Sequence, residues 1–297
     1  MKSRLFPIAN RSDGFTLVEM IVVIVITGII AGMIAVFITR PIEAYVDTAR
    51  RAQLTEAADT ALRRVARDLR TALPNSVRVV EVGVGVNAVK YLEFIPTVGG
   101  GRYRQYPTAG DTGNVLDFSA PDNNGFDVTG PVPVYAAGDF VTIFNLGPGS
   151  VSDAYVGNNR VALTSSNNNA ALFSGDAAPI HTVTFAATQF PAPSPSARFH
   201  VVRNPVTYEC APNAAVPALG QLRRYVSNGF LAAQPTPPAG VTAQLLVDNV
   251  AECDFDYNEV VASGVHTRTG LVTLRLRLES SGESARIVHQ MHVQNAP

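Results

Sequence analysis

The first pattern in the chain is a long apolar run that follows a short polar start. Residues 1–14 are largely polar and basic, and the 24 residues of 15–38 contain a single charged side chain, Glu19. As a helix, this run would be about 36 Å long at ~1.5 Å per residue, which is enough to span a bilayer. The pattern therefore predicts a transmembrane helix over 15–38.

Basic residues lie on the N-terminal side of this run, at Lys2, Arg4 and Arg11. By the positive-inside tendency they hold the N-terminus in the cytoplasm and place the chain after Arg40 in the periplasm. An ordinary secretory signal is disfavoured, because its apolar core of about 7–15 residues would end in a small-residue cleavage site. This run is longer and ends in Arg40-Pro41.

A second helical segment is predicted over 39–73, with a kink at Pro41 and a stop at Pro74. Its apolar positions recur on about one third of the helix circumference and its charged positions lie opposite, so we expect one packed face and one solvated face. The packed face comprises Leu54, Ala58, Ala61, Leu62, Val65, Leu69, Ala72 and Leu73, and the charged face comprises Glu56, Asp59, Arg63, Arg67 and Arg70. Spacing of i, i+4 also predicts the ion pairs Asp47–Arg51, Asp59–Arg63 and Arg64–Asp68.

After residue 74 the hydrophobic period changes to two, which is typical of strands. The runs are Val77–Val86, Tyr91–Ile95, Phe140–Phe144, His181–Phe185, Leu271–Leu278 and Ile287–Val293. A turn signal over Ser280–Glu283 predicts that the chain ends in a β-hairpin. Two stretches rich in Gly, Asn, Pro and Asp, 97–135 and 145–180, are expected to be long loops. The predicted fold class is α+β, with a β-rich globular domain over 74–297.

The composition agrees with a folded domain, since 46% of residues are hydrophobic and 16% are charged. The formal net charge of −1 gives no electrostatic footprint for nucleic acid. The two cysteines, Cys210 and Cys253, fall in the part expected outside the cytoplasm, where an even count favours one disulfide over two free thiols. Metal ligation is disfavoured, because neither cysteine has a Cys-x-x-Cys partner or a nearby histidine.

The search for catalytic chemistry gives no positive signal. The five histidines are scattered, and no Gly-x-Ser-x-Gly string is present. Val82–Val86 lacks the Lys-Ser/Thr of a phosphate loop and favours a weak or edge strand. Asp122–Asp127 could offer oxygen ligands to calcium, but Asp-Asn-Gly runs are usually turns. We therefore expect no cofactor, no metal and no enzymatic activity.

Glu19 needs an explanation, because a carboxylate within a membrane helix costs about 2.5 kcal/mol or more and implies a positively charged partner. The string Gly14-Phe15-Thr16-Leu17-Val18-Glu19 resembles the start of type IV prepilins. The resemblance implies that a prepilin peptidase cleaves the leader 1–14 between Gly14 and Phe15 and methylates the new Phe15 amine. It also implies that Glu19 neutralises this amine in its own subunit or in a neighbour.

Five further segments are similar to minor pilins of the MSHA pilus biogenesis system, labelled MshO; they are 59–73, 206–210, 220–225, 246–257 and 289–297. This resemblance implies a pilin-like fold and a minor pilin that helps to initiate or cap a pilus. The implied partners are other major and minor pilin subunits, the prepilin peptidase, the inner-membrane assembly platform and membrane lipid. The implied location is the inner membrane and then the pilus at the cell surface. A minor pseudopilin of type II secretion and an adhesive module at a pilus tip remain as alternatives.

Overall fold

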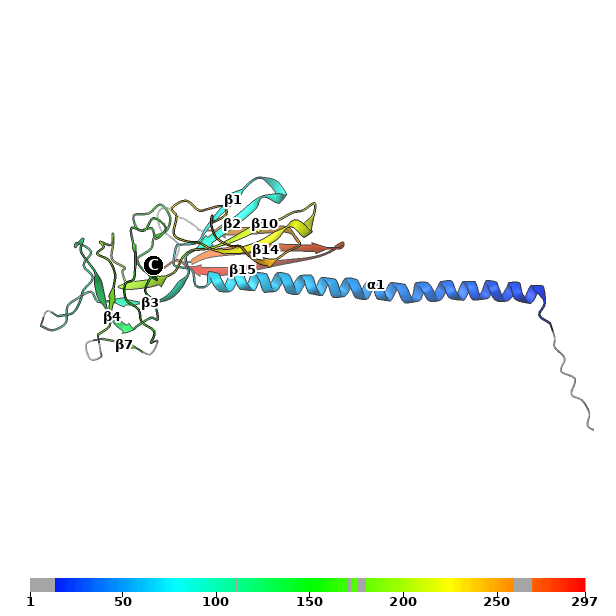
Figure 1. Cartoon of the computed structure of the whole chain (residues 1–297), viewed down its shortest axis with the longest axis horizontal. Helices are drawn as coiled ribbons and strands as arrows, with labels where there is room; N and C mark the ends of the chain where they lie inside the picture. The colour runs from blue at the N-terminus through cyan, green and yellow to red at the C-terminus, as the bar shows by residue number, and fades with distance from the viewer. Residues whose placement is uncertain (1–13, 111, 170–171, 176–179, 259–268, 297) are drawn as a thin grey trace, which may run out of the picture. The chain divides into compact units, whose positions relative to one another are not determined.

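The computed structural model describes residues 14–110, 112–169, 172–175, 180–258 and 269–296 (Figure 1). The chain divides into two compact units, Met1–Arg50 and Arg51–Pro297. In its described part, the first unit consists of the N-terminal stretch of one helix. The second unit holds the end of that helix and all of the described strands. A long N-terminal apolar helix followed by antiparallel sheets confirms the predicted α+β class.

The helix α1 is continuous over Leu17–Leu69 and passes through Pro41, so the kink expected there does not break it. It ends four residues before the predicted end at 73, because the backbone after Leu69 changes its hydrogen-bond partners. The N–H of Ala72 donates to the carbonyl of Leu69, which tightens the last turn. The N–H of Leu73 then donates to the carbonyl of Ile95 at 2.8 Å and pairs with the sheet instead.

The predicted packed face of α1 is confirmed. Its buried residues are Leu54, Ala58, Ala61, Leu62, Val65, Ala66 and Leu69. Two of the predicted ion pairs are present: Arg63 pairs with Asp59 at 2.6 Å, and Arg64 lies 3.9 Å from Asp68. Asp47 pairs with Arg50 at 3.6 Å, and Arg51 pairs with Glu283 in the C-terminal hairpin.

Two antiparallel sheets share one core with the buried face of α1 (Figure 1). The five-stranded sheet has the order β1 (Arg78–Val82), β2 (Val89–Phe94), β10 (Val206–Ala211), β11 (Gln221–Val226) and β12 (Gln244–Val247). The three-stranded sheet contains β13 (Val250–Asn258), β14 (Thr269–Ser280) and β15 (Glu283–Gln294). Leu62 of α1, Leu92 of β2 and Leu274 of β14 are all buried in this core, so the helix and both sheets depend on one another.

The C-terminal hairpin is confirmed. β14 pairs with β15 from Thr269↔Gln294 to Ser280↔Glu283, which leaves Ser281 and Gly282 as a two-residue loop. Both loop residues have positive φ, 51° and 82°, as the turn that matches the twist of a hairpin requires. The run predicted over Val77–Val86 is shorter, because β1 ends at Val82 and the chain then turns into a 3-10 helix, Gly85–Asn87. A second 3-10 helix covers Pro217–Leu219.

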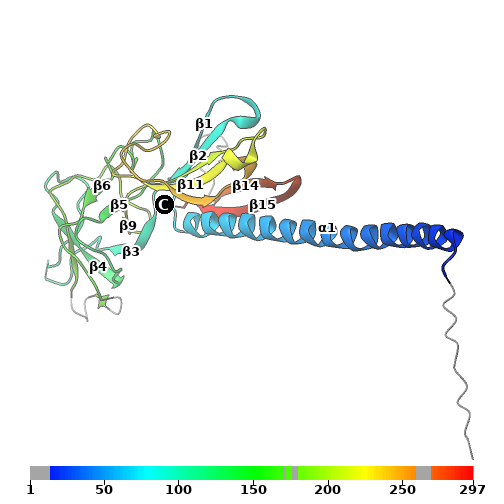
Figure 2. The ribbon, with the colours of Figure 1, turned by 45° about the vertical axis from the view of Figure 1, so that its right-hand side comes forward.

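The expectation of long loops over 97–135 and 145–180 is met only in part, because short strands interrupt both stretches. The described residues of 97–203 form an inserted lobe between β2 and β10 (Figure 2). Its sheet has the order β6 (Arg160–Ala162), β5 (Phe140–Ile143), β9 (Arg198–Val202), β3 (Thr97–Tyr103), β4 (Gly125–Pro131) and β7 (Phe173–Ser174), and β8 (Thr182–Thr184) also pairs with β4. The lobe has a core of its own, which includes Phe126, Val141 and Phe199. A smaller cluster that includes Leu73, Ile95 and Val202 joins it to the rest of the second unit.

Candidate functional site

The beginning of α1 is built as a capping box. The backbone N–H of Glu19 donates to Oγ1 of Thr16 at 3.3 Å, and the N–H of Thr16 donates to Oε2 of Glu19 at 3.4 Å. This reciprocal pair satisfies backbone donors that the first turn of any helix leaves without a partner. The Glu19 carboxylate thus accepts from the backbone of the residue that directly follows Phe15, the second member of the predicted cleavage pair Gly14–Phe15.

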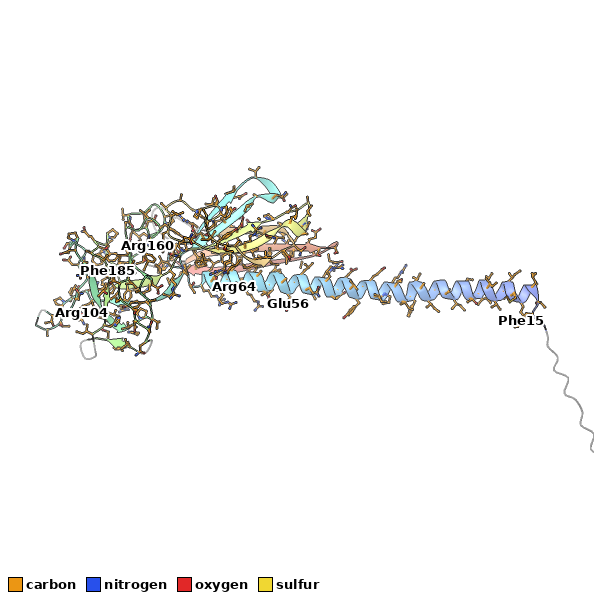
Figure 3. All side chains as sticks on the ribbon, in the orientation of Figure 1. Phe15, Glu56, Arg64, Arg104, Arg160 and Phe185 are labelled. Carbon is orange, nitrogen blue, oxygen red and sulfur yellow. A yellow bond between two sulfur atoms is a disulfide. The ribbon has the colours of Figure 1, made fainter. Side chains whose placement is uncertain are left out.

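The side chains of residues 14–46 are exposed throughout. Phe15, at the start of this stretch, is 79% exposed (Figure 3). α1 is the described helix that is long and apolar enough to cross a membrane, and it lies near the N-terminus. Apolar side chains exposed along a helix are unfavourable in water and favourable in lipid. This helix is therefore compatible with membrane anchoring.

Within the apolar stretch, the sequence reasoning missed the Gly28-x-x-x-Gly32 spacing. A Cβ atom added at either glycine would meet no other atom within 4 Å, so no contact inside the described chain requires a glycine there. Small residues four apart let two membrane helices approach closely, and the motif is legible in the sequence as Gly28-Ile29-Ile30-Ala31-Gly32.

Asp68 fastens the end of α1 to the five-stranded sheet. Its Oδ2 accepts hydrogen bonds from the Tyr208 hydroxyl at 2.7 Å and from Nε of Arg224 at 2.9 Å. Burial and the hydrogen bond to Asp68 raise the pKa of Tyr208, so its hydroxyl stays protonated and donates. Asp68 is not part of the charged face defined above, and the sequence analysis assigned it only the ion pair with Arg64, so its role in holding α1 on the sheet was not foreseen.

Cys210 of β10 and Cys253 of β13 form a disulfide with their Cα atoms 6.3 Å apart. The bridge joins the five-stranded sheet to the three-stranded sheet inside the shared core. This is the disulfide that the cysteine count favoured.

Asp127, the buried acid of the Asp122–Asp127 segment, makes its contacts within the lobe. The Asp127 carboxylate accepts from the Asn114 N–H at 2.8 Å and from the Thr182 hydroxyl at 2.7 Å, and Arg104 lies 3.5 Å away. Among the described residues, His, Cys, Asp and Glu form no group able to hold a metal ion. The described part of this segment therefore offers nothing that favours the calcium alternative over a turn.

Comparison with known proteins bears on the N-terminus. Residues 9–35 match the family model of the prokaryotic N-terminal methylation motif. The chain therefore carries the N-terminal signature of prokaryotic prepilin-type proteins, which type IV pilins and pseudopilins share. No curated protein and no solved structure is significantly similar to the chain.

Proposed function

We propose that the chain is a subunit of a type IV pilus or of a related pseudopilus, with an assembly role and no catalytic one. The observation that carries the proposal is the Gly14-to-Glu19 string at the start of an exposed apolar helix, inside the matched methylation motif. The sequence suggests the positions of cleavage and methylation, and the side chains of residues 14–46 are exposed in the part of the chain that the structure describes.

In the proposed pathway, the prepilin peptidase cuts between Gly14 and Phe15 and methylates the Phe15 amine. The mature chain then stays in the inner membrane through residues 15–38. An ammonium and a carboxylate are each costly in lipid and much less so together, so Glu19 pairs with the Phe15 amine of its own or a neighbouring subunit. The capping box supports this role, because it keeps the carboxylate at the helix start before a partner arrives.

Assembly proceeds by transfer of α1 from lipid into a bundle of subunit helices. The exposed apolar side chains of this helix supply the contact surface, and Gly28 and Gly32 allow close approach of a neighbouring helix. The partners are other pilin subunits and the inner-membrane assembly platform. The second unit would remain on the periplasmic side, where a disulfide is stable.

We further propose that the subunit is a minor pilin of an MSHA-like pilus, which starts or caps the filament. The inserted lobe supports this choice, because it adds a third sheet and a second core that a shaft built from many copies would have to accommodate in every subunit. A minor pseudopilin of type II secretion is the second candidate, and the short length of the motif match leaves both within the same family signature.

The proposal is tested by two measurements, the position of cleavage and the identity of the neighbouring subunits. The N-terminus of the mature chain from native membranes should be Phe15 carrying one added methyl group, as read by tandem mass spectrometry. A different N-terminus would remove the basis of the proposal. Crosslinking through a photoreactive residue at position 37, in the exposed helix, should then capture pilin subunits. Capture of secretion-system subunits would instead select the pseudopilin candidate.

A further inference from the structure

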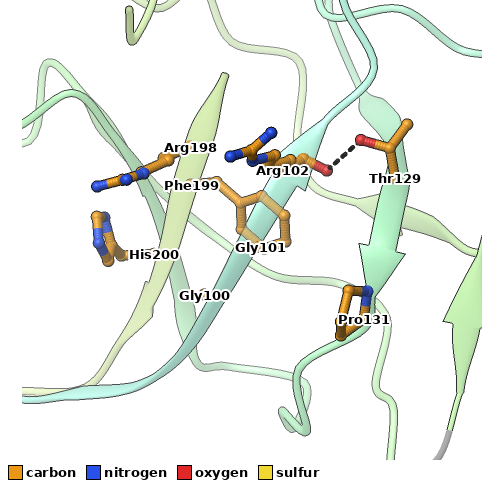
Figure 4. Close-up of a pocket in the computed structure, with 8 residues that line it drawn as sticks. All are labelled: Gly100, Gly101, Arg102, Thr129, Pro131, Arg198, Phe199 and His200. Carbon is orange, nitrogen blue, oxygen red and sulfur yellow. Dashed lines mark hydrogen bonds between the residues drawn. The ribbon is translucent and has the colours of Figure 1, made fainter. Parts of the chain in front are cut away.

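A groove of about 340 Å³ lies on the inserted lobe, over strands β3, β4 and β9 (Figure 4). Five of the residues that line it define the groove for the argument below. They are Gly100, Arg102, Thr129, Arg198 and His200. None of them belongs to the N-terminal segment or to the core shared with α1, so the groove is separate from the residues that carry the proposed assembly role.

Strand register places these side chains on one face of the lobe sheet. Arg102 pairs with Arg198 across β3 and β9, and with Thr129 across β3 and β4. Gly100 pairs with His200 in the same ladder. Directly opposite residues in an antiparallel pair have Cβ atoms about 4.5–5.5 Å apart on the same side of the sheet. The two guanidinium groups therefore extend from neighbouring points of one surface, as Figure 4 shows.

These two arginines differ from the others in the lobe. Arg104 lies 3.5 Å from Asp127, Arg203 pairs with Asp139 at 2.8 Å, and the Arg160 guanidinium stacks 3.6 Å from the centre of an aromatic ring. Neither Arg102 nor Arg198 has an ion-pair partner in the described part of the chain, and both are exposed. Like charges directly opposite in a sheet are unfavourable, so the groove presents positive charge that an external anion would neutralise.

Neutral groups complete the groove. At Gly100 a Cβ atom would lie 2.8 Å from the Phe199 carbonyl oxygen and 3.4 Å from Cδ2 of His200, which is too close for a larger residue. β3 therefore presents bare backbone beside the imidazole. Bare backbone of this kind permits close approach of a ligand. Burial and the Arg198 charge lower the pKa of His200 to about 4, which leaves a neutral imidazole at pH 7. The Thr129 hydroxyl makes a long bond of 3.4 Å to the Arg102 carbonyl and is able to exchange it for a ligand hydroxyl.

We propose that this groove binds a carboxylated sugar residue, such as a uronic acid unit of a polysaccharide. The planar guanidinium fork matches a carboxylate with two parallel hydrogen bonds. The imidazole and the threonine hydroxyl suit ring hydroxyls, and the bare glycine backbone admits the ring itself. The volume lies at the lower end of small-molecule sites, which are about 300–1,000 Å³, and fits a short saccharide.

Nucleic acid suits this groove less well than a carboxylated sugar. Binding to a phosphate backbone depends on many cationic contacts, whereas the groove offers two. The chain as a whole carries a formal charge of −1, so its net charge adds no general attraction for a polyanion. A bare phosphate would use the arginines but leave the neutral groups of the groove without a role.

The experiment uses the full-length chain in detergent micelles and titrates it with tri-galacturonic acid by isothermal calorimetry. Galactotriose, inorganic phosphate and a single-stranded oligonucleotide are titrated in parallel. We expect saturable binding of tri-galacturonic acid, weakened about tenfold or more by Arg102→Gln and by Arg198→Gln because each loses a charge-assisted pair. The matched control Arg67→Gln, on the exposed face of α1, should bind as the unaltered chain does.

Four results would overturn the proposal. These are no saturable binding of tri-galacturonic acid, equal binding of galactotriose, tighter binding of phosphate or oligonucleotide, and an equal loss of affinity in Arg67→Gln. Melting temperatures of the variants check folding, and the comparison of ligands on the unaltered chain decides the matter even if a variant unfolds. Because the purified chain is used, the result is independent of pilus assembly.

Discussion

Thr16 and Glu19 exchange two hydrogen bonds across the first turn of α1, each using its side chain to satisfy the other's backbone N–H. Glu19 therefore has a local structural role besides the charge-neutralising role proposed for it. The two roles can be separated, because a cap needs an acceptor oxygen and neutralisation needs a negative charge.

Glu19→Gln should process normally but fail to assemble. Glutamine keeps an acceptor for the Thr16 N–H, so the helix start is preserved, but the Phe15 ammonium is left without a counter-charge in an apolar bundle. The measurement is filament number per cell by electron microscopy, with cleavage after Gly14 checked by mass spectrometry. Glu19→Val should fail in the same way, although it removes a charge that costs a few kcal/mol in lipid and so anchors at least as well.

Thr16→Ala is the matched control for the cap. It removes the side-chain acceptor at the cost of about 1 kcal/mol of helix stability and leaves the Glu19 charge in place. Filaments should still form. Normal filament numbers with Glu19→Gln, or loss of filaments with Thr16→Ala alone, would contradict the charge role.

Gly14→Ala should accumulate as uncleaved precursor. A Cβ atom at Gly14 would meet no other atom of the described chain within 4 Å, so the fold tolerates alanine and the requirement lies in the peptidase site. Gly28→Ala is the control, since it makes the same chemical change in an equally open position. Intact-mass measurement of membrane extracts distinguishes the two, and normal cleavage of Gly14→Ala would argue against prepilin-type processing.

Asp68→Ala should destabilise the second unit by about 2–3 kcal/mol, because it leaves the Tyr208 hydroxyl and the Arg224 guanidinium without their acceptor. Asp59→Ala removes an equivalent carboxylate, but its partner Arg63 is 70% exposed, and the expected cost is about 0.5 kcal/mol or less. Urea unfolding followed by circular dichroism measures both. Equal effects would show that Asp68 does not fasten α1 to the sheet.

Replacing Cys210 and Cys253 by alanine should lower the stability of the second unit by up to about 4 kcal/mol on the loop-entropy estimate. The bridge closes a sequence separation of 43 residues, and it joins two sheets that share one core. Thermal unfolding of the unaltered chain with and without a reductant should show the same direction of change. Labelling of both thiols in the native, unreduced protein would exclude the bridge.

His200 should make the second unit less stable in mild acid. Its pKa in the folded chain is about 4, below its ordinary value of 6.5, so the unfolded chain binds the proton more tightly. Its contribution is complete above pH 6.5 and is lost as the pH falls towards 4, by up to about 3 kcal/mol. Chemical unfolding at pH 7 and pH 4.5 should show a smaller difference in His200→Gln than in the unaltered chain. An equal difference would show that His200 does not titrate in this window.

The sequence predicted the parts of the molecule with long, regular patterns. The packed face of α1 and the C-terminal hairpin follow from hydrophobic periods of 3.6 and 2 sustained over many residues. In the inserted lobe only the strand runs Phe140–Phe144 and His181–Phe185 were predicted. Other strands, such as Arg160–Ala162 and Phe173–Ser174, are too short to show a period. The groove was not predicted for a different reason. Arg102 and Arg198 are far apart in the sequence, and only strand pairing brings them together.

The inserted lobe leaves and rejoins the five-stranded sheet at facing positions, because Phe94 at the end of β2 pairs with Val206 at the start of β10. A hairpin turn of a few residues could bridge the same two strands. The ladder between β2 and β10 therefore does not require the lobe between them, which could change in length or surface without breaking these strand pairs.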